Sequence, residues 1–183
     1  NRDNVVNEAD ARVLIRYIHG EDFPALNLRQ RTVAVDLSGD GDTADAGEGA
    51  KVWKLGDILN STPKISSWIP LNTYHQKYSD TTYRDYINTE NYKKRGSVFV
   101  GVNDGMLYAF KIGRLELVND PATPTIKARL TNPDPTTPLG HEMWSFIPKN
   151  ALPYLKYLTD PGYCHVYTID LTPYVFDASI NKP

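Results

Sequence analysis

The sequence predicts a mainly β fold with a few short helices, and three observations carry that prediction. The chain of 183 residues holds 13 prolines and 12 glycines, which indicates many turns and few long helices. Its apolar runs are short, and those at 97–102 and 106–110 flank a turn typical of a β-hairpin. Hydrophobic residues make up 40% of the chain, including 12 tyrosines, enough to build a core. The length suits one ordinary domain or a piece of a larger protein.

The composition excludes several classes of protein. With 20 Lys+Arg against 22 Asp+Glu, the chain lacks the basic footprint of a nucleic-acid-binding protein. No stretch approaches the ~20 apolar residues that span a bilayer, so we expect no transmembrane segment. The single cysteine, Cys164, can form neither an internal disulfide nor a two-thiol metal or redox site. The start at Asn1, without Met or a signal peptide, suits a processed or excised piece.

The front of the chain predicts one amphipathic helix followed by a strand and an acidic loop. Asn7 is placed to cap the helix with Asp10 three residues later, and Gly20 is placed to end it. β-Branched residues at 29–35 indicate a strand, and small and acidic residues follow it. Further short strands are expected at 53–58 and 63–69.

The middle of the chain predicts an ordered excursion and then a hairpin. Residues 72–95 carry five tyrosines among polar neighbours, which suits rings that pack on the body of the protein or face a partner. The turn Asn103-Asp104-Gly105 should join the strands at 97–102 and 106–110, because such residues tolerate positive φ.

The last third alternates between loops and short elements. Five prolines between residues 119 and 140 exclude a helix and leave a surface loop or an edge ribbon around 126–130. A strand is expected at 142–147, then a helix capped by Asn150 and ending near residue 160, with Leu152, Leu155 and Leu158 on one side. Residues 165–169 and 174–176 are expected to be short strands.

The hairpin belongs to a longer pattern. Its Asp-Gly turn and Ala109 are followed, after the proline-rich segment, by Gly140 and Trp144. This pattern resembles a propeller blade of the pyrroloquinoline-quinone type, in which Asp-Gly turns the middle hairpin, Ala packs under the sheet, and a later Gly and Trp begin the next strand.

Motifs on both sides of the hairpin narrow the resemblance. In chain order they are similar to the opening of the C-terminal β-propeller of the PilC/PilY family of type IV pilus biogenesis and tip-adhesin proteins, and residues 14–22 resemble the helix before it. Nearly the whole chain is covered. The motifs are residues 53–63, Tyr92 with Arg95, residues 98–110, residues 144–148, Leu152 with Leu155 and Leu158, and His165, Tyr167 and Asp170.

The resemblance implies a partial, modified, quinoprotein-like β-propeller of which this chain holds the first blades only, because each blade takes about 40 residues. Residues 1–50 would be a helix and acidic loop leading into the propeller. Residues 51–183 would hold the first blade or blades, with insertions at about 72–95 and 114–139.

The resemblance also implies a function without catalysis. It suggests a pilus-tip-associated assembly and adhesion protein, extracellular or at the cell surface, and outer-membrane-associated or periplasmic in transit. Its partners would be the remaining blades of the same protein, minor pilins or the pilus tip, and a host or abiotic surface. Calcium dependence is implied for several members.

The acidic loop predicts a calcium site from its own residues. Oxygen ligands stand at positions 1, 3 and 5 of a loop that starts at Asp36, Gly41 occupies position 6, and position 7 offers its carbonyl. The twelfth position is Gly47 instead of a bidentate acid, so a neighbouring carboxylate would have to reach across; a solvated acidic turn is the alternative. The loop does not align with the family's calcium site deeper in the propeller. The candidate ligands are Asp36, Ser38, Asp40, Asp42, Asp45 and Glu48.

Two other functions remain open. The same blade pattern would suit a fragment of a periplasmic quinoprotein-type dehydrogenase with its cofactor site on other blades, and the acidic loop would suit a stand-alone calcium-binding β domain. A hydrolase is disfavoured because no Gly-x-Ser-x-Gly elbow is present. Asp57 is expected to satisfy backbone donors at a bend, and neither it nor His141, Glu142 or His165 is assigned to catalysis.

Overall fold

The computed structural model describes residues 5–180 and contains antiparallel sheets together with a few helices. The chain divides into two compact units. The first holds the chain up to Asp57, Val102–Gly105 and Ile147–Thr168, and the second holds Ile58–Gly101, Met106–Phe146 and the chain from Ile169 on. Both units are built from segments far apart in the sequence. The division into 1–50 and 51–183 stays a prediction.

In the first unit, helix α1 (Glu8–Ile18) confirms the predicted N-terminal helix. Asn7 and Asp10 form a capping box, in which the Asn7 backbone N–H donates to the Asp10 carboxylate at 3.0 Å. Gly20 follows with φ +103, a conformation that suits glycine and ends the helix. Tyr17 is fully buried on this helix.

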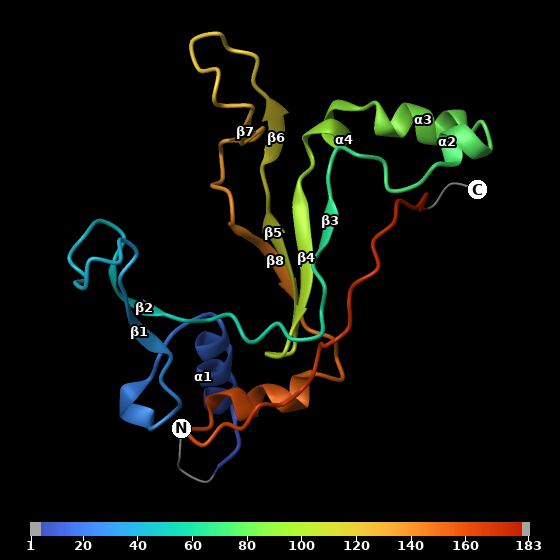
Figure 1. Ribbon diagram of the computed structural model, residues 1–183. Helices are drawn as coiled ribbons and strands as arrows, with labels where there is room; N and C mark the ends of the chain where they lie inside the picture. Colours follow the sequence, from blue (N-terminus) through green and yellow to red (C-terminus); the bar gives the residue numbers. More distant parts are fainter. Residues whose placement is uncertain (1–4, 181–183) are drawn as a thin grey trace. The chain divides into compact units, whose positions relative to one another are not determined.

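A two-stranded ribbon and two 3₁₀ helices complete the first unit (Figure 1). Strands β1 (Thr32–Val35) and β2 (Gly49–Val52) pair antiparallel and carry the acidic loop between them. The 3₁₀ helices are η1 (Pro24–Leu26) and η2 (Leu152–Thr159), and η2 packs on α1.

Two predictions for this unit are wrong. Residues 53–58 contain no strand, because β2 ends at Val52. Asn150 caps no helix: η2 has Ala151 at its N-cap position and no side-chain cap there. The three-residue spacing of Leu152, Leu155 and Leu158 explains the tighter helix, since residues i and i+3 lie above one another in a 3₁₀ helix.

The second unit is built on a four-stranded sheet in the order β3-β4-β5-β8. The strands are β3 (Lys64–Ser66), β4 (Ser97–Val102), β5 (Met106–Lys111) and β8 (Glu142–Phe146), and the pairs β3–β4 and β5–β8 are antiparallel. The predicted hairpin is confirmed as β4 and β5, with Gly105 at φ +91 in its turn.

This sheet has the strand number of a propeller blade, but a propeller needs several blades around an axis. Ala109 is fully buried, as the blade pattern predicts. Within residues 5–180 there is one four-stranded sheet with two separate ribbons, and these described residues form no closed barrel or propeller. The propeller therefore stays a prediction.

Two excursions leave the sheet (Figure 1). Strands β6 (Arg114–Leu117) and β7 (Ala128–Thr131) form an antiparallel ribbon, which confirms the predicted edge ribbon in the proline-rich region. Residues 72–95 form α2 (Tyr74–Lys77), α3 (Thr81–Ile87) and α4 (Glu90–Lys94), so the predicted ordered excursion is helical. Asp80 and Thr89 cap α3 and α4 by accepting backbone N–H groups.

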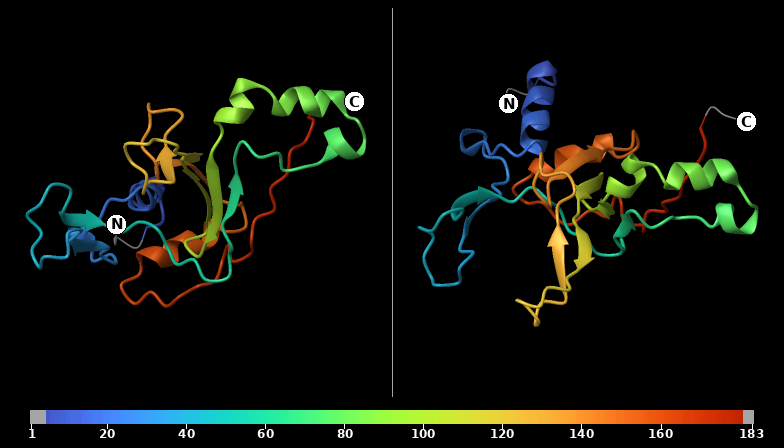
Figure 2. Two further views of the ribbon diagram at one scale, coloured as in Figure 1. Left: turned by 45° about the horizontal axis from the view of Figure 1, so that its top comes forward. Right: turned by 90° about the horizontal axis from the view of Figure 1, so that it is seen from above.

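The chain from residue 169 to 180 is extended but forms no strand, so the strands predicted at 165–169 and 174–176 are wrong. Side chains take the place of a strand ladder: the Asn60 N–H donates to Asp170 at 3.2 Å and the Thr62 N–H donates to the Thr172 hydroxyl at 2.9 Å. Figures 1 and 2 show this segment, in red, running towards α2 and α3. Of the helices in the described part of the chain, none has both the length and the apolar character to cross a membrane.

Candidate functional site

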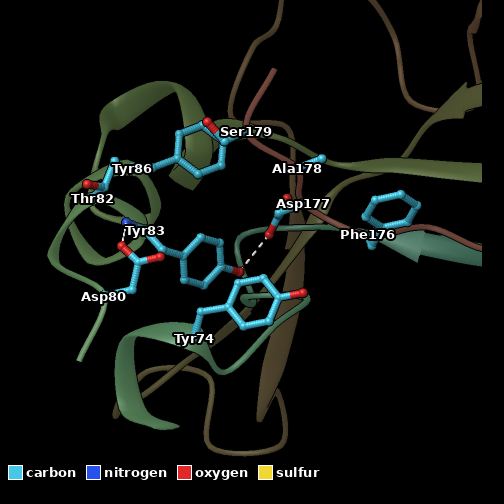
Figure 3. Close-up of a pocket in the computed structure, with 9 residues that line it drawn as sticks. All are labelled: Tyr74, Asp80, Thr82, Tyr83, Tyr86, Phe176, Asp177, Ala178 and Ser179. Atoms are coloured by element: carbon cyan, nitrogen blue, oxygen red, sulfur yellow. Dashed lines mark hydrogen bonds between the residues drawn. The ribbon is translucent and has the colours of Figure 1, made fainter. Parts of the chain in front are cut away.

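The second unit holds a pocket of about 640 Å³ between the helical excursion and the C-terminal segment. Aromatic side chains from both segments surround it (Figure 3). We call it the aromatic pocket. Its lining residues are Tyr74, Asp80, Thr82, Tyr83, Tyr86, Phe176, Asp177, Ala178 and Ser179.

A tight turn between two short helices shapes one side of the pocket. Ser79 adopts a left-handed conformation with φ +54 and turns the chain from α2 into α3. The Asp80 side chain then accepts the Tyr83 N–H at 2.9 Å, which begins α3. Asp80 is therefore both the cap of α3 and a wall of the pocket.

A buried ionic cluster holds the other side of the pocket in place. Asp177, whose side chain is only 5% exposed, accepts hydrogen bonds at 2.7 Å from the hydroxyls of Tyr83 and Tyr92 and from the Arg95 guanidinium. The Arg95 guanidinium also lies 3.4 Å from the centre of the Tyr92 ring. We call these four residues the Asp177 cluster.

The Asp177 cluster is charge-neutral as a whole, with an ionised carboxylate, a charged guanidinium and two protonated phenols. Burial acts to raise the pKa of Asp177, but the hydrogen bonds from Arg95, Tyr92 and Tyr83 outweigh it, and the pKa lies below its usual range. Burial and the hydrogen bond to Asp177 raise the pKa values of Tyr83 and Tyr92. At neutral pH, two neutral phenols and one guanidinium therefore solvate one carboxylate.

The rings form a continuous row from the cluster to the surface. Tyr86 meets Tyr92 edge to face with centroids 5.0 Å apart, and Tyr74 meets Tyr83 the same way at 5.5 Å. Tyr74, Tyr86 and Phe176 remain 42%, 48% and 56% exposed. Such an arrangement can bind a ligand by contact with rings and a few polar groups.

The acidic loop is placed differently from a cation-binding loop. The Asp36 carboxylate accepts the N–H groups of Gly39 and Gly41, and Glu48 accepts those of Leu37 and Ser38. These backbone hydrogen bonds hold the pKa values of Asp36 and Glu48 below their usual range.

The other predicted ligands cap the backbone in the same way or face solvent. Asp40 and Asp42 each accept the N–H of the residue two positions later, and Asp45 is exposed. Within the described part of the chain, no three His, Cys, Asp or Glu side chains are arranged to hold a metal ion. Calcium binding by this loop stays a prediction.

Other residues considered from the sequence have partners within the first unit that are far away along the chain. The Asp57 carboxylate lies 2.7 Å from His165 Nδ1, so this side chain pairs with a histidine and does not cap a bend. In the hairpin turn, Asp104 accepts the Gly56 N–H at 3.2 Å and Asn103 accepts the Thr168 N–H at 3.3 Å. These contacts agree with a structural role for the turn.

Sequence reasoning missed the residue at the centre of the site. Tyr92 and Arg95 stood out in the family motif and the tyrosines of 72–95 in the composition, but Asp177 was not singled out. The available signal was one acid within the otherwise apolar run 174–178. A lone acid among aromatic residues is rarely left without partners.

Comparison with known proteins gives one relative and no family. Over 134 residues the chain is 28% identical to the "Type IV pilus biogenesis factor PilY1 homolog" of Xylella fastidiosa strain Temecula1, an alignment that covers 69% of this chain. The matched region spans about 7% of that protein's length. No family model matches the chain, and no solved structure matches it.

Proposed function

We propose that this chain is a noncatalytic interaction module with a role in type IV pilus biogenesis. The observation that carries the proposal is the 28% identity over 134 residues to a protein named as a type IV pilus biogenesis factor. The motifs from residue 53 to Asp170 resemble, in chain order, those of the same family.

The finer proposal is that the module is the start of a propeller and acts at the pilus tip, in assembly and adhesion. The four-stranded sheet supports this because it is the building unit of a propeller. Further blades of the same protein would then cover its edges, and minor pilins or a surface would be the external partners. This places the protein outside the cell or in the envelope.

Within the module, we take the aromatic pocket as the binding surface. It combines exposed rings with a rigid base, since the Asp177 cluster joins Tyr83, Tyr92 and Arg95 to the C-terminal segment. Rigid aromatic side chains give large contact area at low entropic cost. No observation favours the dehydrogenase alternative.

Gene replacement tests the proposal. In the organism that encodes the chain, the segment encoding it is deleted in frame, and surface pili are quantified in sheared fractions together with twitching motility. We expect both to fall and a wild-type copy to restore them. Normal piliation and motility in the deletion strain would contradict the proposal.

Calcium modulation is a separate proposal about the acidic loop. If Asp36, Ser38 and Asp40 bind calcium after rearrangement, chelation should lower the melting temperature of the chain, and Asp40→Ala should abolish that difference. A melting temperature that does not respond to chelator or calcium would contradict the proposal that this loop binds calcium.

A further inference from the structure

The lining of the aromatic pocket has an unbalanced charge. Its nine residues include two carboxylates, Asp80 and Asp177, and no lysine, arginine or histidine. The Arg95 guanidinium neutralises Asp177, with 2.7 Å between its nitrogen and the Asp177 carboxylate oxygen. The negative charge of Asp80 is left at the pocket wall.

Cations close to Asp80 in sequence are engaged elsewhere. The Lys77 ammonium lies over the Tyr78 ring at 5.4 Å, and the Arg84 guanidinium lies 3.4 Å from the Asp85 carboxylate. Asp80 itself accepts the Tyr83 N–H through one oxygen, Oδ1. Within the described residues, no ion pair is formed by Asp80, and its second oxygen can accept from a ligand.

Exposed aromatic faces line the same pocket as this carboxylate. Tyr74, Tyr86 and Phe176 are each between 42% and 56% exposed and line the same pocket (Figure 3). Aromatic faces attract cations, and a guanidinium stacks on them better than an ammonium because it is planar. The unit already uses this contact internally, with Arg95 on Tyr92 at 3.4 Å.

We propose that the aromatic pocket binds an arginine side chain of a partner polypeptide, with its guanidinium between the tyrosine rings and the Asp80 carboxylate. A volume of about 640 Å³ holds one long side chain together with its flanking backbone. An acidic side chain would be repelled, and a purely apolar one would desolvate the second oxygen of the Asp80 carboxylate without giving it a hydrogen-bond donor. That the partner is a polypeptide rests on the proposed function; the preference for a cation rests on the pocket alone.

Blocked tripeptides test the ligand chemistry directly. Acetyl-Gly-Arg-Gly-amide and its citrulline analogue, which has the same shape but no charge, are titrated into the complete chain, and tyrosine ring shifts are followed by NMR. We expect saturable shifts of Tyr74 and Tyr86 with the arginine peptide, weakening with salt, and binding at least about tenfold weaker with citrulline. Equal affinity for the two peptides, or no saturation with arginine, would overturn the proposal.

A pair of charge-matched variants tests the site. Asp80→Asn keeps a good helix cap while removing the charge, and we expect it to weaken arginine binding at least about threefold and to reduce its salt dependence. Glu90→Gln removes the same charge from α4 at a side chain that is 76% exposed and outside the pocket, and should bind as the wild type does. Equal losses in the two variants would show long-range attraction and not a site, which contradicts the proposal.

A variant in a pocket ring tests the site without removing a charge. Comparing arginine binding with piliation then separates this inference from the proposed function. Tyr86→Leu should weaken binding while leaving the backbone amide spectrum unchanged outside α3, α4 and the segment 176–179, because this ring is 48% exposed and its ring contacts lie within that region. If arginine fails to bind while deletion of the segment abolishes pili, the inference fails and the proposed function stands. If arginine binds and piliation is normal, the proposed function fails and the pocket assignment stands.

Discussion

Two buried clusters, one in each unit, use the same three residue types in different ways. In the first unit, the Arg31 guanidinium lies 3.6 Å from the centre of the Tyr17 ring and 3.4 Å from the Asp22 carboxylate. In the second unit, Arg95 lies on Tyr92 and pairs with Asp177. We call the first set, Tyr17, Asp22 and Arg31, the Asp22 cluster.

The hydrogen-bond donors to the two carboxylates differ. Asp22 accepts the backbone N–H groups of Arg31 and Thr32, at 2.8 and 2.9 Å, from residues nine and ten positions away. The Asp177 carboxylate accepts from the side chains of the Asp177 cluster, 82 to 94 residues away, and the Asp177 carbonyl accepts from the Asn72 side chain at 3.0 Å. The Asp22 cluster thus closes a local turn, whereas the Asp177 cluster ties a distant segment to the helices that line the pocket.

This difference indicates which unit depends more on a single side chain for its stability. Arg31 also donates to the carbonyls of Tyr17 and Glu21, so it keeps partners without Asp22. Removal of Asp177 would take the single carboxylate away from Tyr83, Tyr92 and Arg95 together. The second unit should therefore be the more sensitive to loss of its acid.

Asp177→Ala should have the largest effect. It leaves two buried phenols without their carboxylate acceptor and removes the ion pair of Arg95, whose Nε still donates to the Ser67 carbonyl at 2.7 Å. We expect the free energy of unfolding of the second unit to fall by about 3–5 kcal/mol. Urea unfolding measures this, and hydrogen exchange should show lost protection in α3 and α4, which carry Tyr83 and Tyr92. Asp85→Ala, at an exposed position, is the control and should cost less than about 0.5 kcal/mol. Equal results for the two variants would contradict the tethering role.

Asp22→Ala should have a smaller effect, about 2 kcal/mol, on the first unit. Two backbone N–H groups and the Thr32 hydroxyl lose their acceptor, but Thr32 is exposed and water can replace part of the loss. Glu8→Gln, at an exposed ion pair with Arg12, is the matched control and should be nearly silent. A loss as large as that of Asp177→Ala would break the comparison.

Both clusters should lose stability in acid, through their carboxylates, and in alkali, through their phenols, because the pKa shifts of these two kinds of group have opposite signs. Hydrogen bonds outweigh burial and lower the pKa of Asp22 as well as that of Asp177, so each carboxylate adds stability above the ordinary Asp pKa of about 3.9 and loses it as pH falls through the folded pKa. Burial raises the pKa values of Tyr17, Tyr83 and Tyr92, so their contribution is complete below about pH 10 and is lost as pH rises through the folded values.

Unfolding free energies measured from pH 2 to 12 check both limbs. The double variant Tyr83→Phe/Tyr92→Phe should flatten the alkaline limb of the second unit and leave that of the first unchanged. An unchanged alkaline limb in this variant would show that the two phenols are not responsible for it.

Single hydroxyl deletions should give the smallest effects. Tyr92→Phe removes a donor to a carboxylate and should cost about 2 kcal/mol, whereas Tyr17→Phe removes a donor placed 3.0 Å from two neutral carbonyls, those of Arg29 and Leu158, and should cost about 1 kcal/mol. Both variants keep the ring under its arginine. Urea unfolding of each unit measures the difference, and the reverse order would contradict the role given to the charge of Asp177.

Local patterns were sufficient wherever the deciding residues lie within a few positions of one another. The α1 helix was predicted because Asn7 and Asp10 cap it within one turn, and the β4–β5 hairpin because its turn contains Gly105. The same reasoning failed for the strands predicted at 165–169 and 174–176, because alternation predicts extended backbone but cannot say whether a neighbouring strand is present. Asp80 and Thr89 are residue types that favour helix N-caps, and these two positions are the local signal in 72–95 that predicts α3 and α4.

The sequence by itself determined that this chain is rich in turns and antiparallel strands, that it has one capped N-terminal helix, and that its motifs resemble those of a pilus biogenesis family. Only the tertiary structure decided that Asp177 meets Tyr83, Tyr92 and Arg95, and that a pocket with one unpaired carboxylate lies above them. The physical reason is distance along the chain: capping and turn formation are energies of neighbouring residues, whereas a buried carboxylate selects its donors across more than 80 residues by desolvation and charge, which no local pattern records.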